Sequence, residues 1–128
     1  MARLYYAITE GIRVTVRPHF SPEHSDPTEP RFVFVYRIRI ENVGLRTAQL
    51  LRRRWLITDD AEGVSEIEGE GVIGEQPVLA PGDVHEYESY SVLRGPSGAM
   101  EGAYTFVSSG QPFRVRIPRF ELVSGGGV

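Results

Sequence analysis

The stretch RFVFVYRIRIEN, residues 31–42, decides the fold. Large apolar side chains recur at every second position, and two arginines alternate with the last of them. A period of two residues is that of a strand with one buried face and one solvated face. The apolar face holds Phe32, Phe34, Tyr36, Ile38 and Ile40, and the opposite face holds Arg37 and Arg39. We therefore predict a long strand here.

Shorter segments of the same character lie on either side of this stretch. They are predicted as strands at residues 12–16, 49–58, 64–72, 84–93, 99–107 and 113–117. On the strand at 49–58, Leu51, Trp55 and Ile57 are expected on a common face. Glycine, proline and aspartate mark turns between the strands, and residues 18–30 are expected to form a loop. About seven short strands without a helix pattern indicate an all-β, immunoglobulin- or fibronectin-III-like antiparallel β-sandwich.

Length and composition agree with a single folded domain. The chain has 128 residues, 41% of them hydrophobic and 24% charged, so residues 1–123 are predicted as one domain and residues 124–128 as a flexible glycine-rich tail. A net charge of −3 argues against a nucleic-acid partner. No apolar run is long enough to cross a membrane, and the first residues lack the pattern of a signal peptide. With no cysteine, a cytoplasmic location is expected.

Charged residues on the predicted strands form complementary rows. Arg52 and Arg54 precede the turn at residues 59–63, and Glu66, Glu68 and Glu70 follow it. If a hairpin forms there, the two rows face each other across antiparallel strands. Arg37 and Arg39 are similarly expected to meet Glu86 and Glu88 if their strands are neighbours. We interpret these rows as cross-strand pairs on solvated faces.

The motif most suggestive of chemistry is G-x-G-x-x-G, formed by Gly69, Gly71 and Gly74. In dinucleotide-binding folds such glycines let the backbone approach a pyrophosphate at a helix N-terminus. Here two prolines follow at 77 and 81, and Glu70 and Glu75 would repel phosphate. A strand end whose glycines permit a bulge or tight turn is the structural interpretation. Phosphate or nucleotide binding by the loop remains the alternative.

Candidate metal ligands gather in the expected loop. They are His19, Glu23, His24, Asp26 and Glu29. Imidazole and carboxylate groups suit cobalt, and carboxylates suit magnesium, but the spacing matches no established ligand pattern. No nucleophile elbow or catalytic triad order is visible either. The sequence therefore predicts no enzyme activity and no cofactor.

Several segments, in order along nearly the whole chain, resemble the bacterial ApaG family. They include IRIEN at residues 38–42, WLITD at 55–59, GEGVIGEQPVLAPG at 69–82, PSGAMEG at 96–102 and Ile117-Pro118. The resemblance implies a fibronectin-III-like sandwich and kinship with ApaG domains of certain F-box proteins and of a DNA-polymerase-interacting protein. It also implies a link to cobalt and magnesium resistance. Residues 18–30 and the glycine-rich tail are not part of it.

These observations predict a non-enzymatic binding module with an unidentified protein partner. Its contact surface is expected at a sheet edge or at loops of the sandwich, with residues 69–82 as the first choice. A Gly71→Asp substitution is expected to abolish partner capture while leaving the fold intact. The alternative is a small-ligand protein that binds a divalent cation or a phosphate compound. Homodimerisation through an edge strand is compatible with the pattern but not specified by it.

Overall fold

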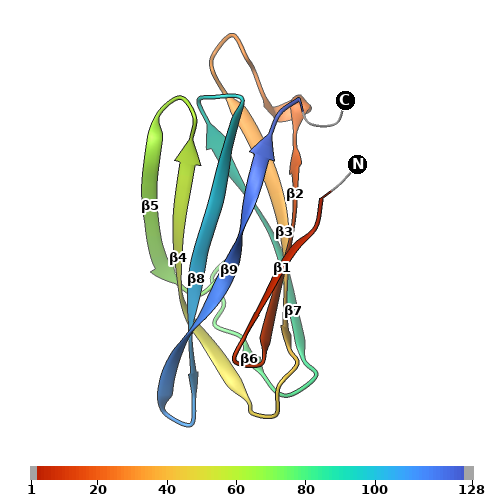
Figure 1. Ribbon diagram of the computed structural model, residues 1–128, viewed down its shortest axis with the longest axis vertical. Helices are drawn as coiled ribbons and strands as arrows, with labels where there is room; N and C mark the ends of the chain where they lie inside the picture. Colours follow the sequence, from red (N-terminus) through yellow and green to blue (C-terminus); the bar gives the residue numbers. More distant parts are fainter. Residues whose placement is uncertain (1–2, 126–128) are drawn as a thin grey trace.

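A computed structural model describes residues 3–125, which form two antiparallel sheets packed face to face (Figure 1). The strand predicted most clearly becomes β3 (Phe32–Asn42), which lies between β2 (Ile12–Phe20) and β7 (Val84–Leu93). β1 (Tyr5–Thr9) pairs with the other edge of β2. The second sheet has the order β5 (Gly63–Glu70), β4 (Ala48–Asp59), β8 (Ser97–Ser108), β9 (Gln111–Val123), and β6 (Val78–Leu79) also pairs with β4. The predicted all-β antiparallel sandwich is confirmed.

The structure adds two strands to the predicted set, β1 and the two-residue β6. β2 also runs on to Phe20, so residues 18–20 are strand rather than the start of a loop, and a short 3-10 helix, η1 (Pro22–His24), follows. No helix within residues 3–125 is long and apolar enough to cross a membrane. Of the predicted tail, Ser124 and Gly125 form a turn after β9, and residues 126–128 lie outside the described residues.

The core fills the space between the two sheets. Most of the apolar face predicted on β3 is buried, and its Tyr36 contacts an aromatic cluster with Trp55 of β4 and Phe120 of β9. The ring centroids of Trp55 and Phe120 are 5.9 Å apart in an edge-to-face arrangement, a favourable geometry for two aromatic rings. This cluster joins β3 of one sheet to β4 and β9 of the other.

A β-bulge in β4 corrects one prediction. The register between β4 and β8 shifts between Leu50 and Arg52, so an extra residue enters β4 at this point. Leu50 is therefore fully buried, whereas Leu51, predicted to face inward, is only partly buried. Beyond the bulge the alternation continues in the opposite phase, which places Arg53 on the same side of the strand as Trp55 and Ile57.

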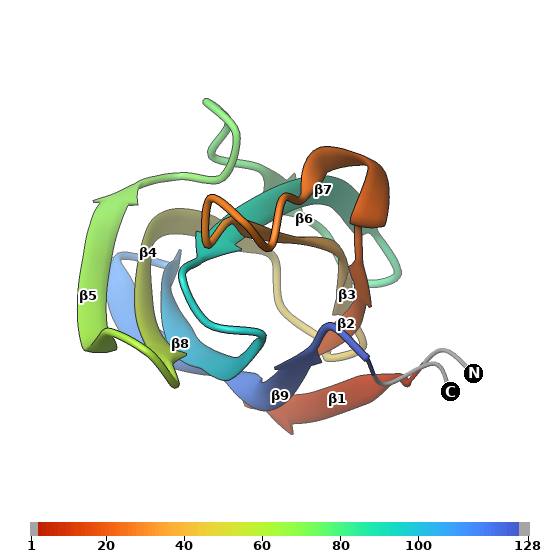
Figure 2. The same ribbon diagram turned by 90° about the horizontal axis from the view of Figure 1, so that it is seen from above.

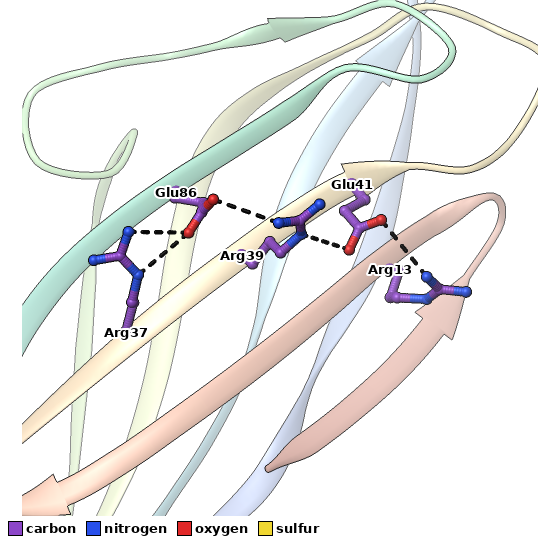
Figure 3. A network of polar contacts seen from close by, with 5 residues as sticks. All are labelled: Arg13, Arg37, Arg39, Glu41 and Glu86. Carbon is purple, nitrogen blue, oxygen red and sulfur yellow. Dashed lines mark hydrogen bonds and ion pairs between the residues drawn. The ribbon is translucent and has the colours of Figure 1, made fainter.

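The predicted charge rows form as cross-strand pairs. On β4 and β5, the Arg54 Nε donates to Glu66 Oε1 at 2.7 Å and lies 3.6 Å from Glu68. On the other sheet a chain of ion pairs crosses β2, β3 and β7 (Figure 3). It runs from Arg13 through Glu41, Arg39 and Glu86 to Arg37, with the closest contact in each pair between 2.8 and 3.6 Å. These groups are exposed or partly exposed, so solvent screens the ion pairs and each contributes little to stability.

Candidate functional site: the glycine loop and the β5–β7 cleft

The glycine motif interrupts an edge strand. β5 and β6 both pair with β4 along the same edge, and residues 71–77 leave that edge and return to it. The departure is held by the Gly71 N–H, which donates to the Leu51 carbonyl at 2.8 Å. The return is held by the Leu50 N–H, which donates to the Pro77 carbonyl at 3.0 Å. Residues 71–77 thus form a loop outside the sheet, and its two ends are hydrogen-bonded to β4 at the bulge.

Each glycine of the motif has a local structural reason. A Cβ at Gly69 would lie 2.7 Å from the Arg53 guanidinium, so Gly69 makes room for that side chain. Gly71 has a φ of +62°, and a Cβ there would lie 2.3 Å from the carbonyl oxygen of Glu75. Gly74 sits in a tight turn with a φ of +74°. The expectation that Gly71→Asp would leave the fold intact is therefore wrong, because the added side chain would collide with the backbone.

Arg53 clamps the loop to the sheet. Its Nη1 donates to the carbonyl oxygens of Glu70 at 2.8 Å and of Gly71 at 2.9 Å. Simple alternation already puts Arg53 on the face of Trp55 and Ile57, but the sequence offered no partner for it there, because the carbonyl oxygens that it binds belong to a loop that only the folded structure brings beside it. A charged donor shared by two carbonyls fixes the start of the loop more firmly than neutral hydrogen bonds would.

Replacing Arg53 by methionine is expected to loosen this loop and to lower the free energy of unfolding by about 1–2 kcal/mol. Amide hydrogen exchange at Gly71 and Val72 should accelerate, because the carbonyls of Glu70 and Gly71 lose their donor. Arg52→Met is the matched control, since Arg52 is an exposed neighbour on the outer face. Equal exchange rates in the two variants would show that the loop is held without Arg53.

The backbone of the motif differs from a phosphate-binding loop. Phosphate-binding loops offer free N–H groups to the ligand. Here the N–H groups of Gly71, Val72 and Glu75 donate to carbonyl oxygens within the protein, and the carbonyls of Glu70 and Gly71 face the Arg53 guanidinium. The loop also leads through Pro77 into β6 rather than into a helix.

The tip of the loop carries an exposed apolar side chain. The Val72 and Glu75 backbones hydrogen-bond to each other at 2.8 and 3.0 Å, which closes a two-residue turn at Ile73 and Gly74. Both turn residues have positive φ, as in a type I′ turn, although Ile73 is branched at Cβ. The Ile73 residue is 62% exposed, whereas Val72 beside it is buried in the core. The loop therefore presents Ile73 on a rigid base.

The candidate metal ligands do not come together in the structure. His19 lies in β2 opposite Val35, whereas Glu23 and His24 lie in η1 with Oε1 and Nδ1 3.9 Å apart. The His24 Nδ1 is also 2.7 Å from Ser21 Oγ, and Asp26 Oδ1 accepts hydrogen bonds from the backbone and hydroxyl of Thr28. These hydrogen bonds lower the pKa of Asp26. In the described part of the chain, no three His, Asp or Glu side chains are grouped to hold a metal ion.

A pair of tyrosines joins the two sheets near Arg53. The hydroxyls of Tyr87 on β7 and Tyr104 on β8 are 2.5 Å apart. Burial raises the pKa of both phenols, so both remain protonated at neutral pH. Sequence reasoning missed this pair, because only the packing of the two sheets brings the residues together.

The opposite end of β5 borders a cleft of about 350 Å³ between β4, β5 and β7. Figure 2 shows β5 and β7 on the side of the sandwich that lies away from β1 and β9. Ile67 faces inward opposite the buried Trp55 of β4, yet it is 47% exposed because the cleft reaches it. Tyr90, on the β7 side of the same cleft, is 65% exposed. The cleft thus combines an apolar lining with two strand edges.

Comparisons with known proteins find close relatives over nearly the full chain. A family profile described as the ApaG domain matches residues 22–108. Protein ApaG of Rhodospirillum centenum is 51% identical over 97% of this chain and 96% of the relative, and Protein ApaG of Paramagnetospirillum magneticum is 48% identical over 94% of each. A crystal structure of an ApaA protein from Bordetella pertussis, 44% identical, superimposes with a TM-score of 0.85 over 92% of this chain and 94% of that one.

Proposed function

Because the chain belongs to the ApaG domain family, we propose that it is a non-enzymatic binding module that recognises a protein partner through the loop of residues 69–82. The observation that carries this proposal is Ile73 at the tip of the loop. A branched residue in the left-handed backbone region is disfavoured, and an exposed large apolar side chain gains nothing from water. Strain of this kind is typical of functional positions, so contact with a partner is the role that we assign to Ile73.

The rigidity of the loop supports the same role. Arg53 holds its start and the Val72–Glu75 hydrogen bonds close its tip, so little conformational entropy is lost when a partner docks. The raised pKa values of Tyr87 and Tyr104 make these buried phenols poor acid–base groups at neutral pH, in line with a binding role rather than a catalytic one.

An Ile73→Asp variant tests the proposal. Aspartate adopts the left-handed region more readily than isoleucine, so the variant is expected to fold. The full-length protein is immobilised, exposed to lysate of its source cells, and the retained proteins are quantified by mass spectrometry. We expect a specific protein whose retention falls at least about tenfold in the variant, as for an apolar anchor at an interface.

Ile8→Asp is the matched control for this experiment. Ile8 is an isoleucine of similar exposure on β1, far along the chain from the loop, and its replacement should leave retention unchanged. Equal retention by the wild type and Ile73→Asp would remove the loop from the contact surface. Equal losses in both variants would indicate nonspecific apolar adsorption and would contradict the proposal.

Binding of a divalent cation or a phosphate compound is the competing function. Amide NMR spectra recorded during titration with magnesium-ATP and then with cobalt distinguish it from protein recognition. We expect no localised change at residues 69–74 or 19–29, because the N–H groups of Gly71, Val72 and Glu75 already donate to carbonyl oxygens and the candidate metal ligands lie apart. Saturable shifts confined to either segment would replace the protein-binding proposal with a ligand-binding one.

A further inference from the structure

The sandwich is closed on one side and open on the other. On the closed side, the Arg116 N–H of β9 donates to Thr9 Oγ1 of β1 at 3.2 Å, and the Glu121 N–H donates to Tyr5 Oη at 3.3 Å. On the open side, β5 pairs with β4 alone and β7 pairs with β3 alone among residues 3–125. β5 therefore presents a strand edge to solvent, and an edge of this kind is a template for another strand.

The two faces of β5 carry different kinds of side chain. Seven of its eight residues are exposed. Ile67 shares the inner face with Ser65 and borders the apolar cleft, whereas Glu66, Glu68 and Glu70 alternate with them on the outer face. A strand added to this edge would place one of its faces against the cleft and the other beside the glutamates.

Acidic side chains outnumber basic ones in this region. All fourteen arginines of the sequence lie outside residues 59–93, the segment that carries both open-side strands and the glycine loop and whose one histidine is His85. Arg54 on β4 offsets Glu66 and Glu68, and arginines of β3 offset Glu86. Among the residues that the structure describes, Glu62, Glu70 and Glu88 take part in no ion pair. The open side therefore keeps an excess of negative charge.

We propose that β5 accepts an extended segment of a partner protein in which Lys or Arg alternates with apolar residues. The apolar residues would occupy the cleft beside Ile67, and the basic residues would pair with the glutamates on the outer face of β5. A second copy of the chain is the disfavoured occupant, because antiparallel pairing of two β5 strands would set glutamate against glutamate. This inference rests on the proposed function and extends it to the class of partner segment.

The test uses a soluble probe that matches the length of β5. A blocked eight-residue peptide of alternating Arg and Val is titrated into the full-length, isotope-labelled protein up to roughly millimolar concentration, and amide shifts are recorded. We expect saturable shifts along residues 63–70. A peptide of the same composition with its four arginines in one block, and an alternating peptide with alternate N-methylated residues, should both bind at least about tenfold more weakly.

A charge-reversed double variant supplies the second readout. Glu68→Lys combined with Glu70→Lys should weaken binding of the Arg–Val peptide about tenfold and confer binding of a Glu–Val peptide, because two attractive cross-strand pairs become repulsive. Glu101→Lys combined with Glu121→Lys changes the net charge equally on β8 and β9, and it should leave the affinity for the Arg–Val peptide nearly unchanged. Both pairs of sites are exposed or partly exposed, so both variants are expected to fold.

Three results would overturn the inference: no shift changes, equal binding of the block peptide, or shifts that lie outside β5 and the cleft. If one of these occurs while Ile73 still controls partner retention, strand addition at β5 is wrong and the binding-module proposal stands. If partner retention is also independent of Ile73, the proposed function fails as well.

Discussion

The Phe120→Ala variant is expected to lose about 3–5 kcal/mol of its free energy of unfolding. Phe120 is fully buried, and its ring centroid lies 6.2 Å from that of Tyr5, 5.8 Å from that of Tyr36 and 5.9 Å from that of Trp55. These partners come from β1, β3 and β4, so truncation opens a cavity where both sheets meet. Urea unfolding followed by the fluorescence of Trp55, the one tryptophan of the chain, measures the change.

Phe113→Ala is the control for cavity size. Phe113 lies on the same strand and stacks on Phe106 at 5.8 Å, but it is only partly buried. Its truncation should cost less than half as much, because less apolar surface is removed from the interior. A loss below about 1 kcal/mol in Phe120→Ala would contradict the central role of the aromatic cluster.

The Asp59→Asn variant is expected to lose about 2–3 kcal/mol at neutral pH. Asp59 ends β4, and its buried carboxylate accepts hydrogen bonds from the N–H groups of Arg94 at 2.7 Å, Gly95 at 3.0 Å and Ala61 at 3.0 Å. Burial acts to raise the pKa of this carboxyl, but the N–H donors prevail and hold the pKa below its ordinary value of 3.8. Asparagine keeps the size of the side chain and loses the charge that these donors stabilise.

The stability that the Asp59→Asn variant loses should depend on pH in a definite direction. Because the pKa of Asp59 is lower in the folded state than in the unfolded state, the carboxylate stabilises the fold fully above the ordinary pKa. That contribution disappears as the pH falls through the folded-state pKa. The difference in free energy of unfolding between wild type and Asp59→Asn, the stability gap, should therefore narrow in acid. Asp60→Asn, at an exposed neighbour that accepts a hydrogen bond from Ser97, should have a small effect at every pH. A gap that is constant from neutral pH to acid would show that charge is not the cause.

The sequence was sufficient for most of the strands, with β1 and β6 missed, and for the pairing of β4 with β5. In residues 36–41 a period of two separates buried from more exposed positions, and this local signal does not need the rest of the fold. The hairpin at residues 59–63 places the arginines of β4 opposite the glutamates of β5 by chain geometry alone. The ion pairs of Arg54 with Glu66 and Glu68 follow from that register.

The glycine motif is a feature that the sequence could locate but could not explain. The sequence identifies Gly69, Gly71 and Gly74 as positions of unusual backbone, but it cannot say what approaches them. Gly69 is small because the Arg53 guanidinium lies against it, and Gly71 is small because the Glu75 carbonyl does. Neither contact could be inferred from the sequence, because only the folded loop brings the Arg53 guanidinium and the Glu75 carbonyl against these glycines.

The buried side of the first part of β4 was decided by tertiary structure. A strand taken alone alternates without interruption, and uninterrupted alternation led to the prediction that Leu51 is buried. The bulge between Leu50 and Arg52 arises from the pairing of β4 with β8, a strand about fifty residues later in the chain. One extra residue reverses the phase of the side chains across the bulge, so that Leu50 enters the core in place of Leu51, while Arg53 keeps the side of Trp55. The sequence alone identified most of the strands and the buried side of a regular strand such as β3, whereas the pairing of β4 with β8 decided the buried side where a bulge interrupts the alternation, at Leu50 and Leu51.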